Sequence, residues 1–256
     1  MTDQILFDID GAIATITLNR PEKFNAANPA MSKAIIAAVD ECNRSDTIRC
    51  VVITGAGPKA FCAGSDIAEL DNYATPWDFR NRVDYCDAIH RLLKPSIAAV
   101  NGHALGGGLE TALSCDIRIA SSHAKFAAPE IKLGWIGGGG MAAFLGHSVG
   151  ASNAALMLMT GDPIDAVRAL AWGLVSEVTE PDALMDRARA LANIIASRAP
   201  IAAETAKRNL KAAFSMPLDE AMLYERDLQT ICFATDDARE GRLAFQEKRP
   251  PLFKRR

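Results

Sequence analysis

The segment that most constrains the fold of this chain is residues 96–116, SIAAVNGHALGGGLETALSCD. It begins as a short apolar strand, passes through a turn, and reaches three consecutive glycines before a helical pattern that holds Glu110 in its first turn. Glycines allow the backbone to turn sharply and a ligand to approach closely. The start of a helix leaves N–H groups without partners, and these can bind a phosphate or stabilise a developing oxyanion. The segment therefore predicts either a carboxylate beside an anion site or a buried turn whose glutamate caps a helix.

Strand and helix patterns alternate along the first part of the chain. Two alternating apolar runs, residues 5–9 and 12–18, meet at Asp10-Gly11, which is a strong signal for a hairpin. Residues 50–54 form a continuous apolar run, which is typical of a strand buried on both faces. Further helices are expected over residues 29–43, 76–93, 150–160 and 165–172 and in a segment ending near residue 146, and short strands over residues 117–120 and 174–178.

The character of the chain changes at Pro181. From there on the apolar residues follow helical spacing, over residues 182–197, 201–214, 218–233 and 237–247. We therefore predict an α/β core over residues 1–180 and a helical region over residues 181–256. Wide apolar faces on these helices favour packing on a neighbouring subunit, although they can also pack on their own core. The basic residues between positions 248 and 256 are expected to form a solvated tail.

Charge and residue usage exclude several kinds of partner. The net charge of −3 gives no reason to expect binding to nucleic acid or to an anionic membrane. No apolar run approaches the ~20 residues that span a bilayer. The six cysteines lie far apart without a CxxC pair, and no secretory signal precedes the first strand, so we expect reduced thiols and a cytoplasmic location. The four histidines show no metal-binding spacing, and we expect no metal.

Several familiar catalytic motifs are missing from the sequence. It contains no Walker-type phosphate loop, and its glycine runs do not form the GxGxxG pattern of a dinucleotide fold. The GxSxG motif is also absent, and Ser65 has no histidine at a recognisable triad position, which disfavours nucleophilic hydrolysis. What remains is a pair of glutamates, Glu110 and Glu130, and two loops of small residues that can present backbone N–H groups to a ligand.

Five motifs in order along the chain resemble those of the enoyl-CoA hydratase/isomerase (crotonase) superfamily. They are NRPEKFNA at residues 19–26, AFCAGSDI at 60–67, NGHALGGGLE at 101–110, APEIKLG at 128–134 and FATDDAREG at 233–241. The resemblance extends over nearly the whole chain, and it implies an α/β fold: a spiral of ββα units with a helical C-terminal region. It also implies assembly as a homotrimer or as a dimer of trimers, with the helical region as the trimerisation region.

The resemblance also implies a role for each site residue. The backbone N–H groups of Ser65 and Gly107 would hold the thioester oxygen, and Glu110 and Glu130 would orient and activate a water molecule, with Glu130 as the proton donor to C2. Contacts to coenzyme A are implied for Ala26, Ala63, Gly64, Ser65, Asp66, Ile67, Ala68, Gly106 and Gly107. Coenzyme A enters as part of the acyl-CoA substrate, so no bound cofactor is expected.

The implied reaction is the reversible addition of water to a trans-2-enoyl-CoA to give a 3-hydroxyacyl-CoA, as in fatty acid metabolism. Two alternatives stay open: another crotonase reaction, either double-bond isomerisation or dehydration of a special hydroxyacyl-CoA, and a non-catalytic relative that binds RNA. The chain departs from the family pattern after Gly134, where hydratases commonly have Pro-Gly and then Gly-Gly-Thr. Trp135 stands in this departure, where it either shapes the acyl pocket or fills core volume.

Overall fold

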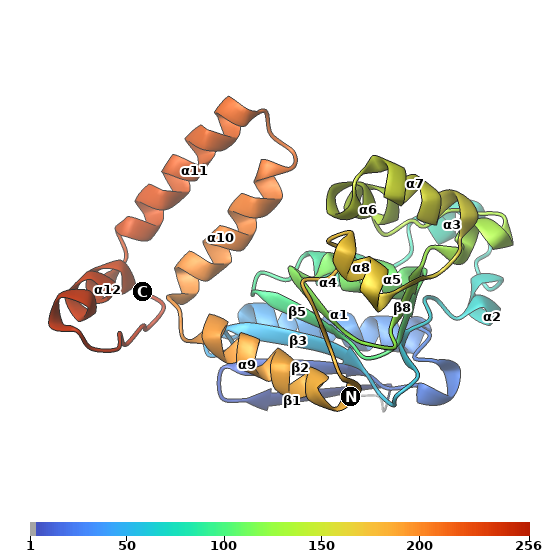
Figure 1. Cartoon of the computed structure of the whole chain (residues 1–256), viewed down its shortest axis with the longest axis horizontal. Helices are drawn as coiled ribbons and strands as arrows, with labels where there is room; N and C mark the ends of the chain where they lie inside the picture. The colour runs from blue at the N-terminus through green and yellow to red at the C-terminus, as the bar shows by residue number, and fades with distance from the viewer. Residues whose placement is uncertain (1–3) are drawn as a thin grey trace.

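The main sheet of the protein has six strands and is parallel except at one edge. A computed structural model describes residues 4–256 (Figure 1), so the first three residues of the predicted core lie outside the described residues. The strands, in their order across the sheet, are β1 (Ile5–Asp10), β2 (Ile13–Leu18), β3 (Cys50–Gly55), β5 (Ser96–Val100), β7 (Ile117–Ser121) and β10 (Glu177–Thr179). β1 and β2 pair antiparallel as the predicted hairpin, and the other neighbours are parallel.

A second sheet of four very short strands lies beside the first. Its order is β4 (Ala60–Cys62), β6 (His103–Leu105), β8 (Lys125–Ala127) and β9 (Ile164–Asp165). Along the chain β3, β5 and β7 are each followed by one of these short strands and then by helical structure. This repetition is the expected ββα spiral. The sequence analysis missed these four short strands: it placed residues 60–62 in a loop and residue 165 at the start of a helix.

Helices cover both faces of the main sheet. Val51 and Ile53 of β3 point into a core shared with α1 (Pro29–Arg44), α4 (Tyr85–His90) and α5 (Gly107–Ser114). Cys50 and Val52 point to the opposite face, where they meet the buried residues of α9 (Leu184–Ala196). The strand is buried on both faces as predicted. α9 shares a core with the sheet although it falls within residues 181–256, and the division at residue 180 stays a prediction.

Most of the remaining helices agree with the expected ranges to within a few residues, but α2 was not expected, and the helix expected over residues 76–93 is divided into α3 and α4. The remaining helices are α2 (Ile67–Leu70), α3 (Pro76–Arg80), α6 (Met141–Val149), α7 (Ala151–Thr160), α8 (Ala166–Ala171), α10 (Pro200–Ala213), α11 (Leu218–Phe233) and α12 (Asp236–Glu247), with short 3-10 turns at Pro21–Lys23, Pro129–Leu133 and Pro181–Ala183. α1 begins as predicted, since the Asn28 side chain accepts a hydrogen bond of 2.8 Å from the Met31 N–H and Pro29 follows. The strand expected over residues 174–178 begins only at Glu177, because Leu174 and Val175 are buried in the core without pairing to a strand.

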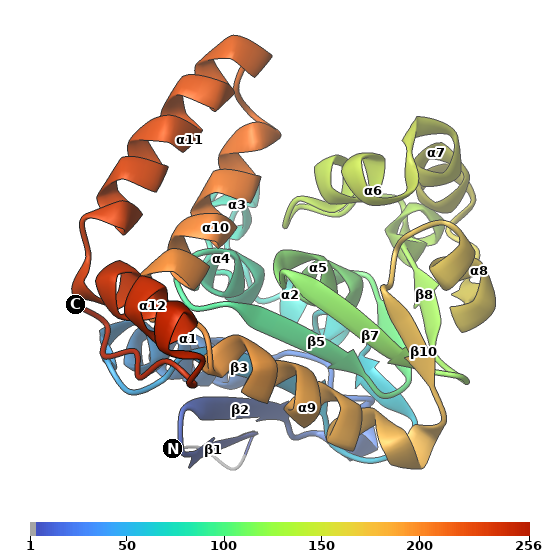
Figure 2. The ribbon, with the colours of Figure 1, turned by 60° about the vertical axis from the view of Figure 1, so that its left-hand side comes forward.

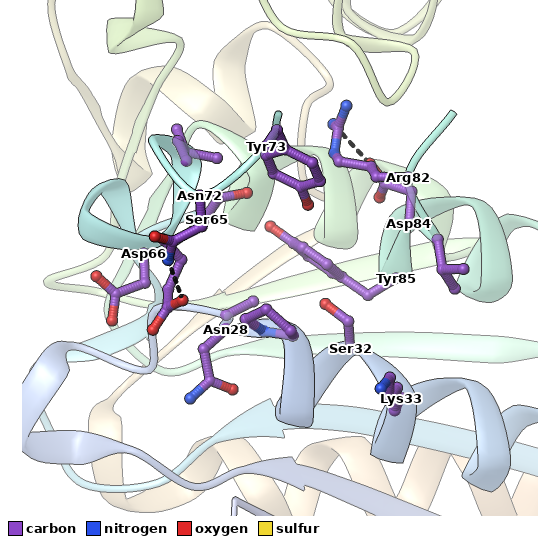
Figure 3. A pocket seen from close by; sticks show the side chains of 15 residues that line it. Asn28, Ser32, Lys33, Ser65, Asp66, Asn72, Tyr73, Arg82, Asp84 and Tyr85 are labelled. Atoms are coloured by element: carbon purple, nitrogen blue, oxygen red, sulfur yellow. Dashed lines mark hydrogen bonds and ion pairs between the residues drawn. The ribbon is translucent and has the colours of Figure 1, made fainter. Parts of the chain in front are cut away.

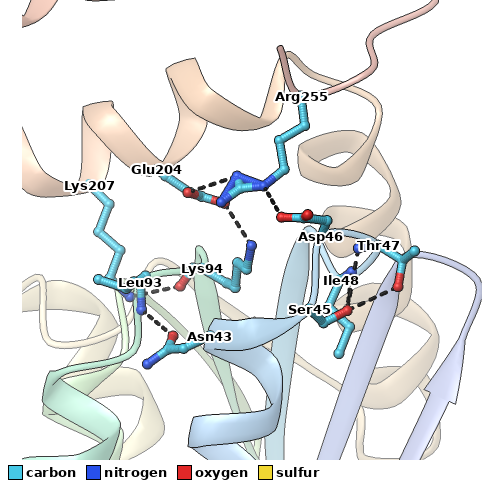
Figure 4. A network of polar contacts seen from close by, with 10 residues as sticks. All are labelled: Asn43, Ser45, Asp46, Thr47, Ile48, Leu93, Lys94, Glu204, Lys207 and Arg255. Atoms are coloured by element: carbon cyan, nitrogen blue, oxygen red, sulfur yellow. Dashed lines mark hydrogen bonds and ion pairs between the residues drawn. The ribbon is translucent and has the colours of Figure 1, made fainter.

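Two buried lysines hold the beginning of α10 against the core. The Lys94 ammonium lies 2.9 Å from the Glu204 carboxylate of α10 (Figure 4). Lys207 donates to the Lys94 carbonyl at 2.8 Å and pairs with Asp116 at 2.8 Å. Removing one partner of a buried pair leaves an uncompensated charge, which is strongly destabilising. These contacts therefore fix where the helical region leaves the body.

The basic C-terminal residues are tied down by ion pairs. Arg255 lies 2.9 Å from Asp46 and 3.0 Å from Glu204, and Arg249 lies 2.6 Å from Glu240. The expectation of a solvated tail is wrong for these two residues, because Arg249 pairs with a carboxylate of the preceding helix and Arg255 with carboxylates from distant parts of the chain. α10 and α11 run side by side and project from the body (Figures 1 and 2). No helix within residues 4–256 is both long enough and apolar enough to cross a membrane.

Candidate active site

Four segments that are distant in sequence enclose one cleft of about 150 Å³. They are the loop from β4 to α2, the start of α5, the 3-10 turn at Pro129–Leu133, and the glycine-rich segment after Gly134. The cleft is lined by most of the residues that the sequence singled out: Ala63, Gly64, Ser65, Ile67, Gly106, Gly107, Glu110 and Glu130. Of the other predicted contacts, Asp66 lines an adjoining cavity of about 320 Å³, and Ala26 and Ala68 line neither. Asp66 instead pairs with Arg20 at 3.1 Å, and Arg20 also donates to the Ala26 carbonyl at 2.6 Å.

The backbone of Ser65 lies beside the backbone of Gly107. Ser65 forms a parallel bridge with Ala27, in which the Ala27 and Asp66 N–H groups make the hydrogen bonds, so the Ser65 N–H points away from that pairing. Gly107 is the first residue of α5, where an N–H has no partner within the helix. A Cβ atom on Gly64 would lie only 3.0 Å from the Gly107 nitrogen, and Gly64 has a φ of +96°, so glycine is required there. The backbones of Ser65 and Gly107 thus line the same cleft, each with an N–H group that is outside the adjoining backbone pairing.

Glu110 projects from the first turn of α5 into the cleft and is almost fully buried. Its side chain is 5% exposed, and Oε1 accepts a hydrogen bond of 2.7 Å from the Gly139 N–H. A Cβ atom on Gly137 or on Gly139 would lie 2.8 Å from a carboxylate oxygen of Glu110. The glycine run after Trp135 therefore lets the backbone close tightly around this carboxylate. This explains why the departure from the family pattern is so rich in glycine.

Glu130 approaches the same cleft from the 3-10 turn that follows Pro129. A Cβ atom on Gly106 would lie 2.9 Å from Glu130 Oε1, and Gly106 has a φ of +54° that suits glycine. Within residues 4–256, Glu130 Oε2 is buried and has no hydrogen-bond partner. One oxygen of Glu130 is therefore held close to the glycines before α5, and the other has a lone pair available to a ligand.

Burial alters the proton affinity of both carboxyls. Burial raises the pKa of Glu110 from 4.5 to about 7, the Gly139 hydrogen bond opposes this rise, and the negative charges of Glu130 and Asp84 add to it. Burial also raises the pKa of Glu130, and a hydrogen bond from its own backbone opposes that rise. Carboxyls with raised pKa values near neutrality suit general acid–base chemistry. Among residues 4–256 no group of three His, Cys, Asp or Glu side chains is arranged to hold a metal ion.

The raised pKa of Glu110 predicts a pH-dependent cost to folding. Its folded-state pKa of about 7 exceeds the unfolded value of 4.5, so the native state loses stability as pH rises through this interval. From pH 5 to pH 8, the unfolding free energy of Glu110→Gln is expected to rise relative to that of wild type by about 2.5 kcal/mol. Denaturant unfolding at a series of pH values measures this difference. Curves that stay parallel for the two proteins would contradict the raised pKa.

The sequence analysis did not identify every residue at the site. Leu70 and Arg82 were not expected there, yet both line the cleft and the adjoining cavity. Tyr85 lines that cavity from the start of α4 (Figure 3). No local signal marked Tyr85, because its segment has only a loosely helical pattern. Trp135 lines the cleft and is 39% exposed, so it shapes the pocket instead of filling core volume.

The chain is similar to known proteins over nearly its whole length. The family model described as enoyl-CoA hydratase/isomerase matches residues 8–256. The chain is 38% identical to a short-chain-enoyl-CoA hydratase from Clostridium acetobutylicum, over 96% of each chain. It is 37% identical to an (E)-benzylidenesuccinyl-CoA hydratase from Thauera aromatica, over 98% of each chain. Its structure is similar to that of an enoyl-CoA hydratase from Bacillus anthracis, with a TM-score of 0.93, 33% identity and coverage of 99% of this chain and all of the other.

The predicted resemblance and the predicted fold are both confirmed by these matches. The match covers the two glutamates, the glycine-rich start of α5 and the helical C-terminal region together. The chain belongs to the enoyl-CoA hydratase/isomerase family of enzymes.

Proposed function

We propose that this protein adds water reversibly to a trans-2-enoyl-CoA to give a 3-hydroxyacyl-CoA. The observation that carries the proposal is that two carboxylates, the buried Glu110 and the partly buried Glu130, line one cleft with the backbones of Ser65 and Gly107. Close relatives whose names give hydratase activity support it. Coenzyme A arrives as part of the thioester, and no bound cofactor takes part in the proposed reaction.

The backbone donors act on the thioester oxygen. The N–H groups of Ser65 and Gly107 would donate to the carbonyl oxygen of the bound substrate and stabilise the negative charge that develops there. Preorganised donors of this kind are strongest where water is excluded. Both donors are main-chain groups, so the proposed chemistry makes no demand on the Ser65 hydroxyl. Position 107 requires glycine, because a Cβ atom there would overlap the Tyr85 hydroxyl. The predicted contacts to coenzyme A stay part of this proposal.

The two glutamates act on the water. The water oxygen bonds to C3, one water proton passes to a carboxylate, and a proton passes from a carboxyl to C2, so one molecule of water is added. The Gly139 N–H holds Glu110 Oε1 and so fixes the orientation of this carboxylate. The family resemblance assigns the C2 proton to Glu130, whose Oε2 has no protein partner within the described residues. The two carboxyls interact, so they titrate as a pair.

The walls of the cleft suit an apolar acyl group. Apolar side chains line it together with the glutamates: Phe79, Leu133, Trp135 and Ile136. An isomerase needs only one acid–base residue, whereas two glutamates line the cleft here. The alternative that this protein is a non-catalytic family member that binds RNA has less support, because the chain carries a net negative charge.

The proposal is tested by mixing the purified protein with crotonyl-CoA in ¹⁸O-labelled water. Loss of the enoyl-thioester absorbance together with one ¹⁸O atom in the product is the expected result. An isomerase would convert a 3-enoyl-CoA without incorporating the label. The proposal would be overturned if the products formed from enoyl-CoA substrates never carried ¹⁸O, or if no enoyl-CoA were turned over.

We also propose that the protein assembles as a homotrimer or as a dimer of trimers. Large apolar side chains are exposed along the projecting helices: Leu210, Phe214, Leu218, Met222, Leu223, Ile231 and Phe233. A surface this apolar is typical of a subunit interface. Light scattering is expected to give a mass of three or six chains of 27.4 kDa, and a monomer at micromolar concentration would contradict this.

The six free cysteines agree with a reducing compartment, and we propose a cytoplasmic location.

A further inference from the structure

Tyr85 carries a buried hydroxyl that the mechanism above does not use. The residue is 5% exposed, and its hydroxyl has no hydrogen-bond partner within residues 4–256. The Ser65 side chain is near enough to affect the phenol, but the two hydroxyls do not meet the geometry of a hydrogen bond. A buried polar group without a partner is unusual in a folded protein and costs stability. The hydroxyl therefore suggests a ligand that supplies the missing acceptor.

The position of this hydroxyl relates it to the oxyanion donors. A Cβ atom on Gly107 would overlap the Tyr85 hydroxyl and would lie 3.5 Å from the Gly64 Cα atom. The hydroxyl thus sits where the two segments that carry the donors come together. Tyr85 also lines the cavity of about 320 Å³ that adjoins the cleft at Ser65. Figure 3 shows its hydroxyl directed into that cavity, on the side where Ser65 and Tyr73 lie.

The surrounding contacts fix Tyr85 in place. Asp84 caps α4 by accepting a hydrogen bond of 2.9 Å from the Cys86 N–H, and Arg82 pairs with Asp84 at 2.7 Å. The Cys86 thiol donates to the Gly107 carbonyl at 3.4 Å, which links the start of α4 to the start of α5. The phenol is therefore preorganised with respect to Gly107, as an effective electrostatic donor has to be.

We propose that the Tyr85 hydroxyl donates a third hydrogen bond to the carbonyl oxygen of the bound acyl thioester, beside the N–H groups of Ser65 and Gly107. This inference rests on the proposed acyl-CoA substrate, but it does not require that the reaction be hydration. As the carbonyl oxygen becomes an enolate oxygen, its hydrogen bonds strengthen, so the phenol lowers the barrier as well as aiding binding. Burial raises the pKa of Tyr85 well above 10, so the phenol keeps its proton across the physiological range.

The experiment compares wild type with Tyr85→Phe. Binding of butyryl-CoA labelled with ¹³C at the carbonyl is followed by infrared difference spectroscopy, and hydration of crotonyl-CoA is followed in parallel. We expect the bound carbonyl band of the variant to lie at higher frequency than that of wild type, and kcat/KM to fall about 10- to 100-fold, mostly through kcat. Tyr224→Phe on α11, far from the cleft, is the matched control and should change neither readout.

Several outcomes separate this proposal from its alternatives. An unchanged carbonyl band with kcat/KM within twofold of wild type would overturn it. Because the hydroxyl has no protein partner, the thermal unfolding midpoint of Tyr85→Phe should not fall; a large fall with an unchanged band would assign Tyr85 a packing role. Should Tyr85→Phe fail to fold, wild type grown with 3-fluorotyrosine, a stronger donor, is expected to lower the band further, and no shift would overturn the proposal. If wild type binds butyryl-CoA but hydrates no enoyl-CoA, the proposed function fails while the carbonyl band still tests Tyr85.

Discussion

Replacing Glu130 with Gln is expected to remove most hydration of crotonyl-CoA while leaving thioester binding close to that of wild type. The amide cannot deliver a proton to C2, whereas its size and shape preserve the packing against Gly106. Loss of a positioned acid–base group typically costs about 10²–10⁴-fold in rate. Glu110→Gln is expected to cost a similar factor, because its carboxylate orients the same water. Steady-state rates and the dissociation constant of butyryl-CoA measure the two effects separately.

The control for both variants is Glu220→Gln on α11, an exposed glutamate outside the cleft. It should keep wild-type rates and show no pH-dependent change in stability. Hydration by Glu130→Gln at more than a tenth of the wild-type rate would exclude an essential proton transfer by Glu130. Since the pair shares its protons, the double variant should lose little more than the stronger single one.

Gly107→Ala is expected to lower kcat/KM by about 10²–10³-fold, the usual cost of losing one oxyanion donor. The new Cβ atom would overlap the Tyr85 hydroxyl, so the start of α5 and the Tyr85 side chain have to move apart. The Gly107 N–H then no longer points at the carbonyl oxygen that Ser65 holds. Rates with crotonyl-CoA and the carbonyl band of bound butyryl-CoA measure the loss.

Gly146→Ala is the matched control, since a Cβ atom there has no neighbour within 4 Å and lies within α6. It should retain activity and gain about 0.5–1 kcal/mol of stability from the better helix former. Adding Tyr85→Phe to Gly107→Ala removes the overlapping oxygen, so the double variant should be more active than Gly107→Ala alone. If Gly107→Ala keeps wild-type kcat/KM, the N–H of Gly107 is not an oxyanion donor.

The features that the sequence alone determined are local or periodic ones. The hairpin at Asp10-Gly11, the buried strand β3, the capped start of α1 and the four C-terminal helices all follow from short-range preferences and apolar spacing. The glycines before α5 and the two glutamates could be predicted as site residues because they stand in motifs whose order matches the enoyl-CoA hydratase/isomerase family. Such signals survive in the sequence because each depends on residues only a few positions apart.

The tertiary structure alone decided the features that depend on distant partners. β4, β6, β8 and β9 are two or three residues long, too short to show a period, and they form only because segments far apart in the chain hydrogen-bond to one another. The raised pKa of Glu110 comes from burial, and the Gly139 N–H that partly opposes this rise lies 29 residues away in the chain. Arg255 pairs with Asp46 and Glu204, which are 209 and 51 residues away in the chain. The Tyr85 hydroxyl lies beside Gly107, which belongs to another helix. Burial and contact energies of this kind arise when the chain packs, so no local pattern records them.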